Sequence, residues 1–263
     1  MGDTTPRFTA NGLRKEFGGI TALDGIDLSV GGTTILGVAG PNGSGKTTLI
    51  RCLLGIISPS AGEVRVAGTR PTAFTAADRR RLGYMPQHTA VYDDLTVREN
   101  VAFFDTLYGV DDRAAAVDTA LSVVGLTDRA DSRIDELSGG MVRRTSLACA
   151  LVYDPDMLFL DEPTVGLDPE LRAAMWEGLR RRRDDGALVV VSTHYLGEVD
   201  RCDRVLFFSE GSVLALDSPE RIREKTNTDD LEDAFLALVA ADRGGVSGSG
   251  QDTVTASNRG GES

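Results

Sequence analysis

Short apolar segments recur along the chain with the length of buried β-strands. Residues 35–39 read Ile-Leu-Gly-Val-Ala, and residues 157–160 and 188–191 contain only Met, Leu, Phe and Val. Runs of this kind favour strands covered on both faces, whereas the alternating apolar and polar residues within 7–30 indicate short half-buried strands separated by turns. Further strands are predicted at 64–66, 82–85, 205–208 and 213–216, the last two forming a hairpin around Gly211.

Apolar residues at helical spacing follow several of these strands and fill most of the chain between residues 90 and 152. Thr96-Val97-Arg98-Glu99 fits a capping box, in which the Thr and Glu side chains satisfy N–H groups at a helix start. Asp168-Pro169 gives an N-cap followed by proline at the first helical position. Helices are predicted at 48–54, 96–107, 113–124, 138–150, 169–183 and 229–240, with a disordered tail from Gly244 onward.

A glycine-rich segment between the strand at 35–39 and the helix at 48–54 fits the phosphate-binding pattern G-x-x-x-x-G-K-[ST]. Its glycines allow main-chain N–H groups to turn toward phosphate oxygens, and the next helix points its positive end at the same place. The Lys ammonium group can bind the β- and γ-phosphates, and the Thr hydroxyl can ligate Mg²⁺. The segment indicates a nucleotide site without separating ATP from GTP. It consists of Gly40, Pro41, Asn42, Gly43, Ser44, Gly45, Lys46 and Thr47.

Two carboxylates, Asp161 and Glu162, directly follow the apolar strand at 157–160. Downstream of a phosphate loop, this arrangement predicts that Asp161 holds the Mg²⁺ shell and that Glu162 polarises an attacking water. The alternative is an ordinary acidic pair in a solvated turn.

Four further features suggest a functional site, and three of them also have a structural interpretation. Phe17, at a strand end upstream of the phosphate loop, can stack on a base or pack in the core. Gln87 lies just after a strand, where functional polar groups often sit. Ser138-Gly139-Gly140 is either a second anion site at a helix start or only a helix cap. His194 follows the strand at 188–191 and either bonds a γ-phosphate or is structural.

Composition narrows the class of protein. The 263 residues are 41% hydrophobic and 26% charged, which is ordinary for a soluble globular protein. No apolar run approaches the roughly 18 residues that span a bilayer, and residues 1–14 are too polar for a signal peptide, so we expect a cytoplasmic protein. The net charge of −12 argues against nonspecific nucleic-acid binding. The spacing of Cys52, Cys149 and Cys202 predicts neither a disulfide framework nor a metal site.

In the order in which they occur, these features resemble the motifs of the ATP-binding cassette (ABC) ATPases over about residues 7–240. The resemblance implies an α/β fold with a P-loop NTPase (RecA-like) sheet core at 31–57 and 158–226. An antiparallel β subdomain would come from the early strands and an inserted α-helical subdomain from about 88–152. The implied domains are an ABC ATPase domain at 1–226, a C-terminal helix at 227–243 and a disordered tail at 244–263.

The same resemblance implies a role for each motif, with ATP and Mg²⁺ as cofactors. The implied nucleotide-binding residues are Phe17, the Walker A residues 40–47 with Thr48, and the signature residues Ser138, Gly139 and Gly140. The implied Mg²⁺ ligands are Thr47, Gln87 and Asp161, and the implied catalytic residues are Gln87, Glu162 and His194. The implied dimer contact is the D-loop, Gly166, Leu167 and Asp168.

One position departs from the family pattern. Met141 stands at the fifth signature position, where Gln is common. The residues that would contact the γ-phosphate are intact, so we expect activity to persist.

Four segments resemble the type-2 exporter branch of the family: 84–87, 95–100, 107–109 and 231–235. This implies an ATP-hydrolysing subunit at the inner face of the cell membrane. It would power transport, with export favoured, through a separate integral-membrane permease. The subunit would pair with a second copy of itself or with a homologous ATPase subunit. The alternative is a non-transport ABC ATPase acting on DNA or ribosomes. Such relatives usually carry long coiled-coil insertions or two cassettes, which favours transport here. An ordinary P-loop GTPase or kinase would leave the signature and His194 unaccounted for.

Overall fold

The computed structural model describes residues 6–88, 90–108 and 113–244. The chain forms two compact units. The first combines residues 1–73 with residues 194–263, and the second is the continuous segment 74–193. The predicted tail lies outside the described residues except for its first position, which is the last residue of a helix.

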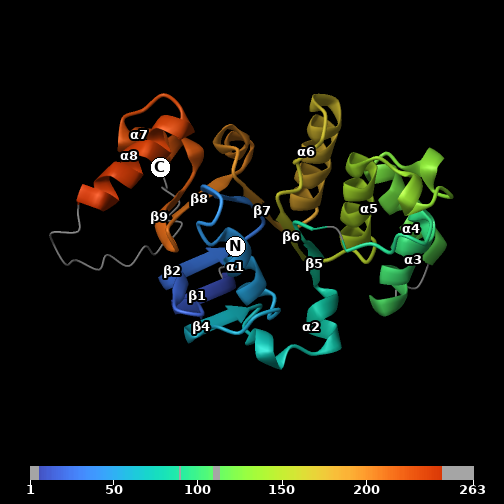
Figure 1. Ribbon diagram of the computed structural model, residues 1–263, viewed down its shortest axis with the longest axis horizontal. Helices are drawn as coiled ribbons and strands as arrows, with labels where there is room; N and C mark the ends of the chain where they lie inside the picture. The colour runs from blue at the N-terminus through green and yellow to red at the C-terminus, as the bar shows by residue number, and fades with distance from the viewer. Residues whose placement is uncertain (1–5, 89, 109–112, 245–263) are drawn as a thin grey trace, which may run out of the picture. The chain divides into compact units, whose positions relative to one another are not determined.

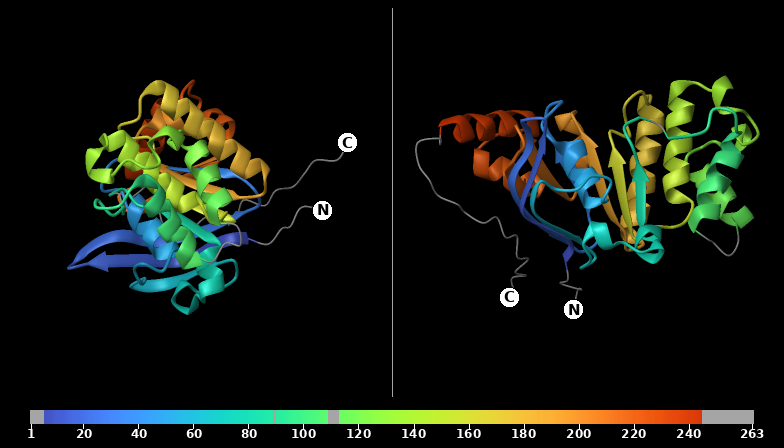
Figure 2. Two further views of the ribbon diagram at one scale, coloured as in Figure 1. Left: turned by 90° about the vertical axis from the view of Figure 1, so that its right-hand side faces the viewer. Right: turned by 60° about the horizontal axis from the view of Figure 1, so that its bottom comes forward.

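Three strands of the first unit form an antiparallel sheet. β1 (Pro6–Phe17) pairs with β2 (Ile20–Gly31) on one side and with β4 (Ala61–Val66) on the other. β1 and β2 lie side by side as the long blue strands of Figures 1 and 2. The predicted antiparallel sheet is present, but the prediction of short strands over 7–30 is wrong.

The two long strands remain paired because bulges absorb their irregularities. The register of β1 on β2 shifts between Ala10 and Leu13, and Gly12 within this shift has φ 54°. Gly12 N donates a hydrogen bond to Asp27 Oδ1 at 2.7 Å, so a side chain of β2 satisfies the bulged main chain. A glycine at this point therefore marks a bulge rather than the turn that its sequence context predicts.

The other strands of the first unit surround the start of the predicted phosphate loop. β3 (Ile35–Ala39), buried at every position, runs parallel to β8 (Arg204–Ser209), which forms an antiparallel hairpin with β9 (Ser212–Asp217). Helix α1 (Lys46–Leu53) follows the loop. The unit is completed by the 3-10 helices η1 (Pro71–Ala73) and η4 (Leu196–Arg201) and by α7 (Pro219–Thr226) and α8 (Leu231–Gly244).

Three parallel strands lie at the centre of the second unit. β6 (Met157–Asp161) is flanked by β5 (Leu82–Met85) and β7 (Leu188–Thr193). Every residue of β6 and β7 is buried, which is why both segments read as unbroken apolar runs. Because parallel strands end at the same edge, the polar residues that follow β5 and end β6 and β7 come together.

In the second unit, three helices contact one another, and a fourth helix is longer. α3 (Val97–Tyr108), α4 (Arg113–Val123) and α5 (Gly139–Leu151) contact one another, as Figure 1 shows. α6 (Pro169–Asp184) carries the fully buried Trp176. The remaining elements are α2 (Ala76–Arg80), η2 (Thr127–Arg129) and η3 (Ile134–Glu136). Across the described ranges, no helix combines the length and apolar character needed to cross a membrane.

Side-chain caps occur both on helices that the sequence predicts and on helices that were missed. The capping box is confirmed: Thr96 N donates to Glu99 Oε2 at 2.8 Å, and Glu99 N donates to Thr96 Oγ1 at 3.1 Å. Asp168 Oδ1 accepts from Leu171 N at 2.9 Å, as its cap position predicts. Two short helices, α2 and α7, were not predicted, although Thr75 and Ser218 cap them with the same side-chain chemistry.

Candidate functional site

The phosphate loop of the first unit is packed against its neighbours at its glycines. A Cβ atom built on Gly40 would lie 2.0 Å from Phe208 O on β8, which leaves no room for a side chain. Gly45 has φ 111°, and a Cβ there would lie 2.6 Å from a main-chain oxygen of β2. Helix α1 begins directly after Gly45, which offers no side-chain cap. The N–H groups of residues 46–48 therefore have no intrahelical acceptors, as an anion site requires.

Lys46 is buried beneath this loop. Its Nζ donates to Gly40 O at 2.8 Å and to Pro41 O at 2.9 Å. Ser44 is also buried, and its Oγ has no hydrogen-bond partner within the described residues. Phosphate oxygens would supply an acceptor to the hydroxyl of Ser44 and a counter-charge to the ammonium group of Lys46.

Phe17 is not part of the core, because 47% of its surface is exposed. The core interpretation of this residue is therefore wrong. Lys15 Nζ lies 4.9 Å from the centre of the Phe17 ring and donates to Ser58 O at 2.8 Å. The Phe17 ring at the end of β1 is thus partly exposed to solvent and makes a cation–π contact with Lys15.

The ends of β6 and β7 are joined through Ser192. Its Oγ donates a short hydrogen bond to Asp161 Oδ1 and accepts one from Glu162 N at 3.0 Å. Asp161 is fully buried, and its Oδ2 has no hydrogen-bond partner within the described part of the chain. A buried carboxylate oxygen without a donor is costly unless a cation is supplied, and Mg²⁺ prefers carboxylate oxygen.

Two further side chains fix Glu162. Gln87 Nε2 donates to Glu162 Oε2 at 3.1 Å, and an Nη of Arg143 donates a short hydrogen bond to Glu162 O. Burial lowers the pKa of the Arg143 guanidinium, while the nearby charges of Glu162 and Asp161 oppose this effect. Glu162 itself has φ 53°, a left-handed conformation that is uncommon for a residue other than glycine. The structure therefore places Gln87 beside Glu162, which directly follows Asp161.

The signature and the D-loop also meet within the second unit. Ser138 caps α5, with its Oγ accepting from Met141 N at 3.4 Å. Because Met141 contributes its main chain to this cap, its departure from the common residue type does not affect the cap. A Cβ on Gly140 would lie 3.4 Å from Gly166 O, so the start of α5 lies beside the loop that leads to Asp168 and α6.

His194 lies just after β7 and belongs to the first unit. It is partly buried, and its ring lies 4.0 Å from the Tyr195 ring, centre to centre, at an interplanar angle of 40°. Its predicted bond to a γ-phosphate stays a prediction.

Sequence reasoning missed three residues that support these predicted groups. They are Ser192, which bridges Asp161 and Glu162; Arg143, which holds the main chain of Glu162; and Lys15, which contacts Phe17. Ser192 could have been found, because it lies near the end of a buried strand beside the strand that ends in Asp161. Nothing in the sequence around Arg143 separates it from Arg144.

The family model for ABC transporters matches residues 23–165, more than half of the chain. The Nod factor export ATP-binding protein I of Burkholderia lata is 40% identical over 215 residues, covering 81% of this chain and 71% of that protein. The daunorubicin resistance ATP-binding protein DrrA3 of Streptomyces coeruleorubidus is 38% identical over 235 residues, covering 88% and 74%.

A solved structure of a dimeric ATP-binding cassette, in a post-hydrolysis state with ADP and Pi, superposes with a TM-score of 0.74. It is 25% identical to this chain and covers 80% of it and 98% of that chain.

This chain belongs to the ABC transporter family. The predicted α/β fold of a P-loop NTPase is confirmed by the structural similarity. The chain is an ATP-binding, ATP-hydrolysing subunit of a transporter rather than a cassette that acts on DNA or ribosomes.

Proposed function

We propose that this chain powers export through a separate integral-membrane permease, working at the cytoplasmic face of the membrane as one of two paired cassettes. The names of its relatives, which refer to export and drug resistance, support the direction of transport. We place the ATPase domain at residues 1–226, with a helical subdomain at about 88–152 and a C-terminal helix at 227–243. The permease would determine the cargo.

Within the site, we propose a role for each group. Phe17 stacks on adenine, and residues 40–48 bind the phosphates through main-chain N–H groups and the ammonium of Lys46. The carboxylate of Glu162 orients the attacking water and accepts its proton. Gln87, which donates to Glu162 Oε2, fixes the orientation of that carboxylate. His194 bonds the γ-phosphate.

The residues present fit a Mg²⁺ ion. Asp161 Oδ2 is buried without a donor, and the partner of its other oxygen, Ser192 Oγ, orients the carboxylate. The Thr47 hydroxyl and the Gln87 amide oxygen are the further proposed ligands. When bound, the ion would neutralise charge that develops on the phosphates.

One observation carries the proposal of a pair: the chain has two separate helix starts with the main-chain chemistry of an anion site. The first is the start of α1, and the second is the start of α5, which Ser138 caps. A single triphosphate needs only the first. In a head-to-tail pair, Ser138-Gly139-Gly140 of one subunit would face the γ-phosphate held by the other, and Gly166, Leu167 and Asp168 would lie at the contact.

ATP would stabilise such a pair because it contacts both subunits only in the closed state, and hydrolysis would release them. The Glu162→Gln variant, which is expected to retain bound ATP, should elute as a dimer with ATP and as a monomer without it in size-exclusion chromatography. Adding Ser138→Arg should abolish the dimer, while one-chain ATP binding persists. Ser138→Thr, which keeps the cap, is the control. A Glu162→Gln/Ser138→Arg protein that still dimerises with ATP would refute the proposal.

A further inference from the structure

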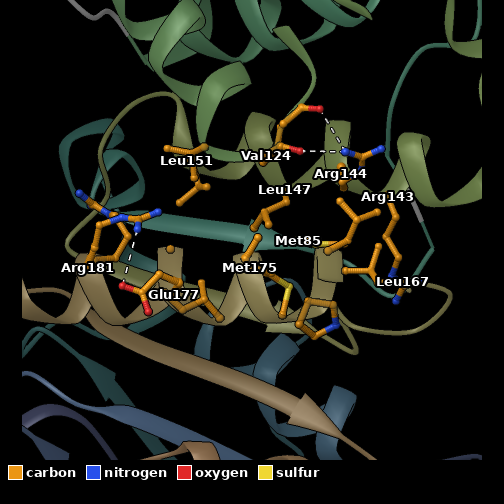
Figure 3. Close-up of a pocket in the computed structure, with 18 of the residues that line it drawn as sticks. Met85, Val124, Arg143, Arg144, Leu147, Leu151, Leu167, Met175, Glu177 and Arg181 are labelled. Atoms are coloured by element: carbon orange, nitrogen blue, oxygen red, sulfur yellow. Dashed lines mark hydrogen bonds and ion pairs between the residues drawn. The ribbon is translucent and has the colours of Figure 1, made fainter. Parts of the chain in front are cut away.

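A cavity of 310 Å³ lies within the second unit, between α5 and α6 (Figure 3). Its wall includes Arg143 and Pro163, which adjoin Glu162. Its interior is apolar. Leu147 and Leu151 of α5 point into it from one side and Met175 of α6 from the other, with Met85 of β5 nearby. An apolar space of this kind favours an apolar ligand over water.

The charge around the cavity is opposite to that of the protein. Four arginines and one glutamate line it, namely Arg143, Arg144, Arg181, Arg182 and Glu177, whereas the whole chain has a net charge of −12. Arg181 is paired with Glu177 at 3.7 Å, and Arg182 forms an ion pair with Asp154. Arg143 lies near the charges of Glu162 and Asp161, and Arg144 lies near that of Asp168 alone, so the cationic edge of the cavity is centred on Arg144.

Arg143 and Arg144 have donors left over. Arg144 Nη1 donates to Val124 O at 3.2 Å and to Gly125 O at 3.1 Å, and Arg143 donates to the main chain at the end of β6. The Nε atoms of both residues are buried and have no hydrogen-bond partner among the residues that the structure describes. Burial lowers the pKa of the Arg144 guanidinium, which means that its charge is poorly solvated where it lies. A partly buried cation in this condition favours an anion as its partner.

From the apolar interior and this cationic edge, we propose that the cavity binds a small anionic amphiphile, a medium-chain carboxylate, with its aliphatic chain between α5 and α6 and its head group at Arg144. The volume is about twice that of a roughly 150 Å³ cavity that accommodates benzene, so on the order of ten non-hydrogen atoms fit. Octanoate has this size and charge.

Such a ligand would bridge the two helices whose N-terminal ends carry Ser138 and Asp168. Leu167, in the loop before α6, is itself part of the cavity wall. A ligand that fills the cavity would therefore contact the loop proposed to meet the second subunit. Its binding requires neither ATP nor pairing of the subunits.

Isothermal titration of the full chain without nucleotide, using octanoate below its aggregation concentration, tests the proposal. We expect saturable one-to-one binding, with octylamine and 1-octanol at least about tenfold weaker because neither supplies an anion to the arginines. The failure of octanoate to saturate, or equal binding of octylamine, would overturn the proposal whatever the ATPase results are.

Two variants locate the ligand. Leu151→Trp fills one end of the cavity and should abolish octanoate binding, and Arg144→Met should weaken it about tenfold or more. The matched controls are Leu107→Trp, which adds the same ring at an exposed position of α3, and Arg98→Met, which removes an exposed guanidinium. Thermal unfolding shows whether each variant is folded. If Arg144→Met does not fold, Leu151→Trp and the comparison of octanoate, octylamine and 1-octanol still test the proposal. Unchanged binding in folded Leu151→Trp would show that the ligand lies elsewhere.

Discussion

The phosphate loop and the carboxylate group at the end of β6 are built by opposite means. The loop uses main-chain groups from one short segment, with glycines where neighbouring atoms leave no space. The carboxylate group uses side chains from four separate elements or their flanks, in which Gln87, Arg143 and Ser192 converge on Asp161 and Glu162. A site built from main-chain groups is therefore disrupted when a side chain is added, whereas a site built from side chains is disrupted when one of them is removed.

The largest expected effect distinguishes ATP hydrolysis, which we assign to the carboxylate group, from ATP binding, which we assign to the phosphate loop. Glu162→Gln keeps an amide that can remain beside Gln87 but loses the base, so ATP should still bind while turnover falls by roughly 10²–10⁴-fold. Lys46→Ala should instead lose tight ATP binding, because the buried ammonium is the side-chain charge beneath the loop. Nucleotide titration and phosphate release measure the two quantities. Near-normal turnover in Glu162→Gln would refute the role of this carboxylate.

The second prediction compares two glycines of the loop. Gly45→Ala should unfold at lower denaturant concentration than Gly43→Ala, with a difference of at least about 2 kcal/mol in the free energy of unfolding. Both residues have positive φ, at 111° and 80°, but only at Gly45 would the new Cβ meet other atoms. Gly43→Ala is therefore the control for backbone strain alone. Equal stability of the two variants would show that the close approach to β2 is easily relieved.

The third prediction removes one support of the carboxylate group. Ser192→Ala should raise the Mg²⁺ concentration needed for half-maximal ATPase activity by roughly 10–100-fold, because the Asp161 carboxylate loses the hydroxyl that orients it. Glu162 N would keep its bond to Ser192 O at 3.1 Å, so the main chain should stay in place. Ser146→Ala, which deletes a buried hydroxyl from α5, is the control. A Mg²⁺ dependence equal to that of the control would mean that Asp161 needs no orienting partner.

The difference between the two regions also determines how much of each was visible in the sequence. The phosphate loop, β3 and α1 were predicted together because everything that forms the loop lies within about twenty consecutive residues. The strands β6 and β7 were predicted because burial on both faces leaves an unbroken apolar run.

Contacts between distant residues were not predicted. Ser192 bonds Asp161 from 31 positions away, and the Arg143 guanidinium reaches the main chain of Glu162 across 19. Neither pairing leaves a periodicity or a motif of its own. The exposure of Phe17 likewise depends on how the end of β1 lies against its neighbours, which apolar character alone does not reveal.

The smallest expected effect concerns Phe17, whose side chain is proposed to stack on the adenine of the nucleotide that the phosphate loop binds. Phe17→Ala should weaken ATP binding by roughly 1–3 kcal/mol without lowering the melting temperature, because the ring is 47% exposed and contributes little to the core. Lys15→Met alone removes the cation 4.9 Å from the ring and should weaken ATP binding by only about two- to fivefold, the value of an exposed cation–π contact.

Inorganic triphosphate, which has no base to stack, distinguishes this role from a general charge effect. Its affinity should be the same in the wild type, Phe17→Ala and Lys15→Met. In the double variant the loss of ATP affinity should be less than the sum of the single losses, because Lys15 acts through the ring. Lys15→Arg, which keeps the charge, is the control. If Lys15→Met weakens triphosphate and ATP equally, Lys15 acts on the phosphates and not on Phe17.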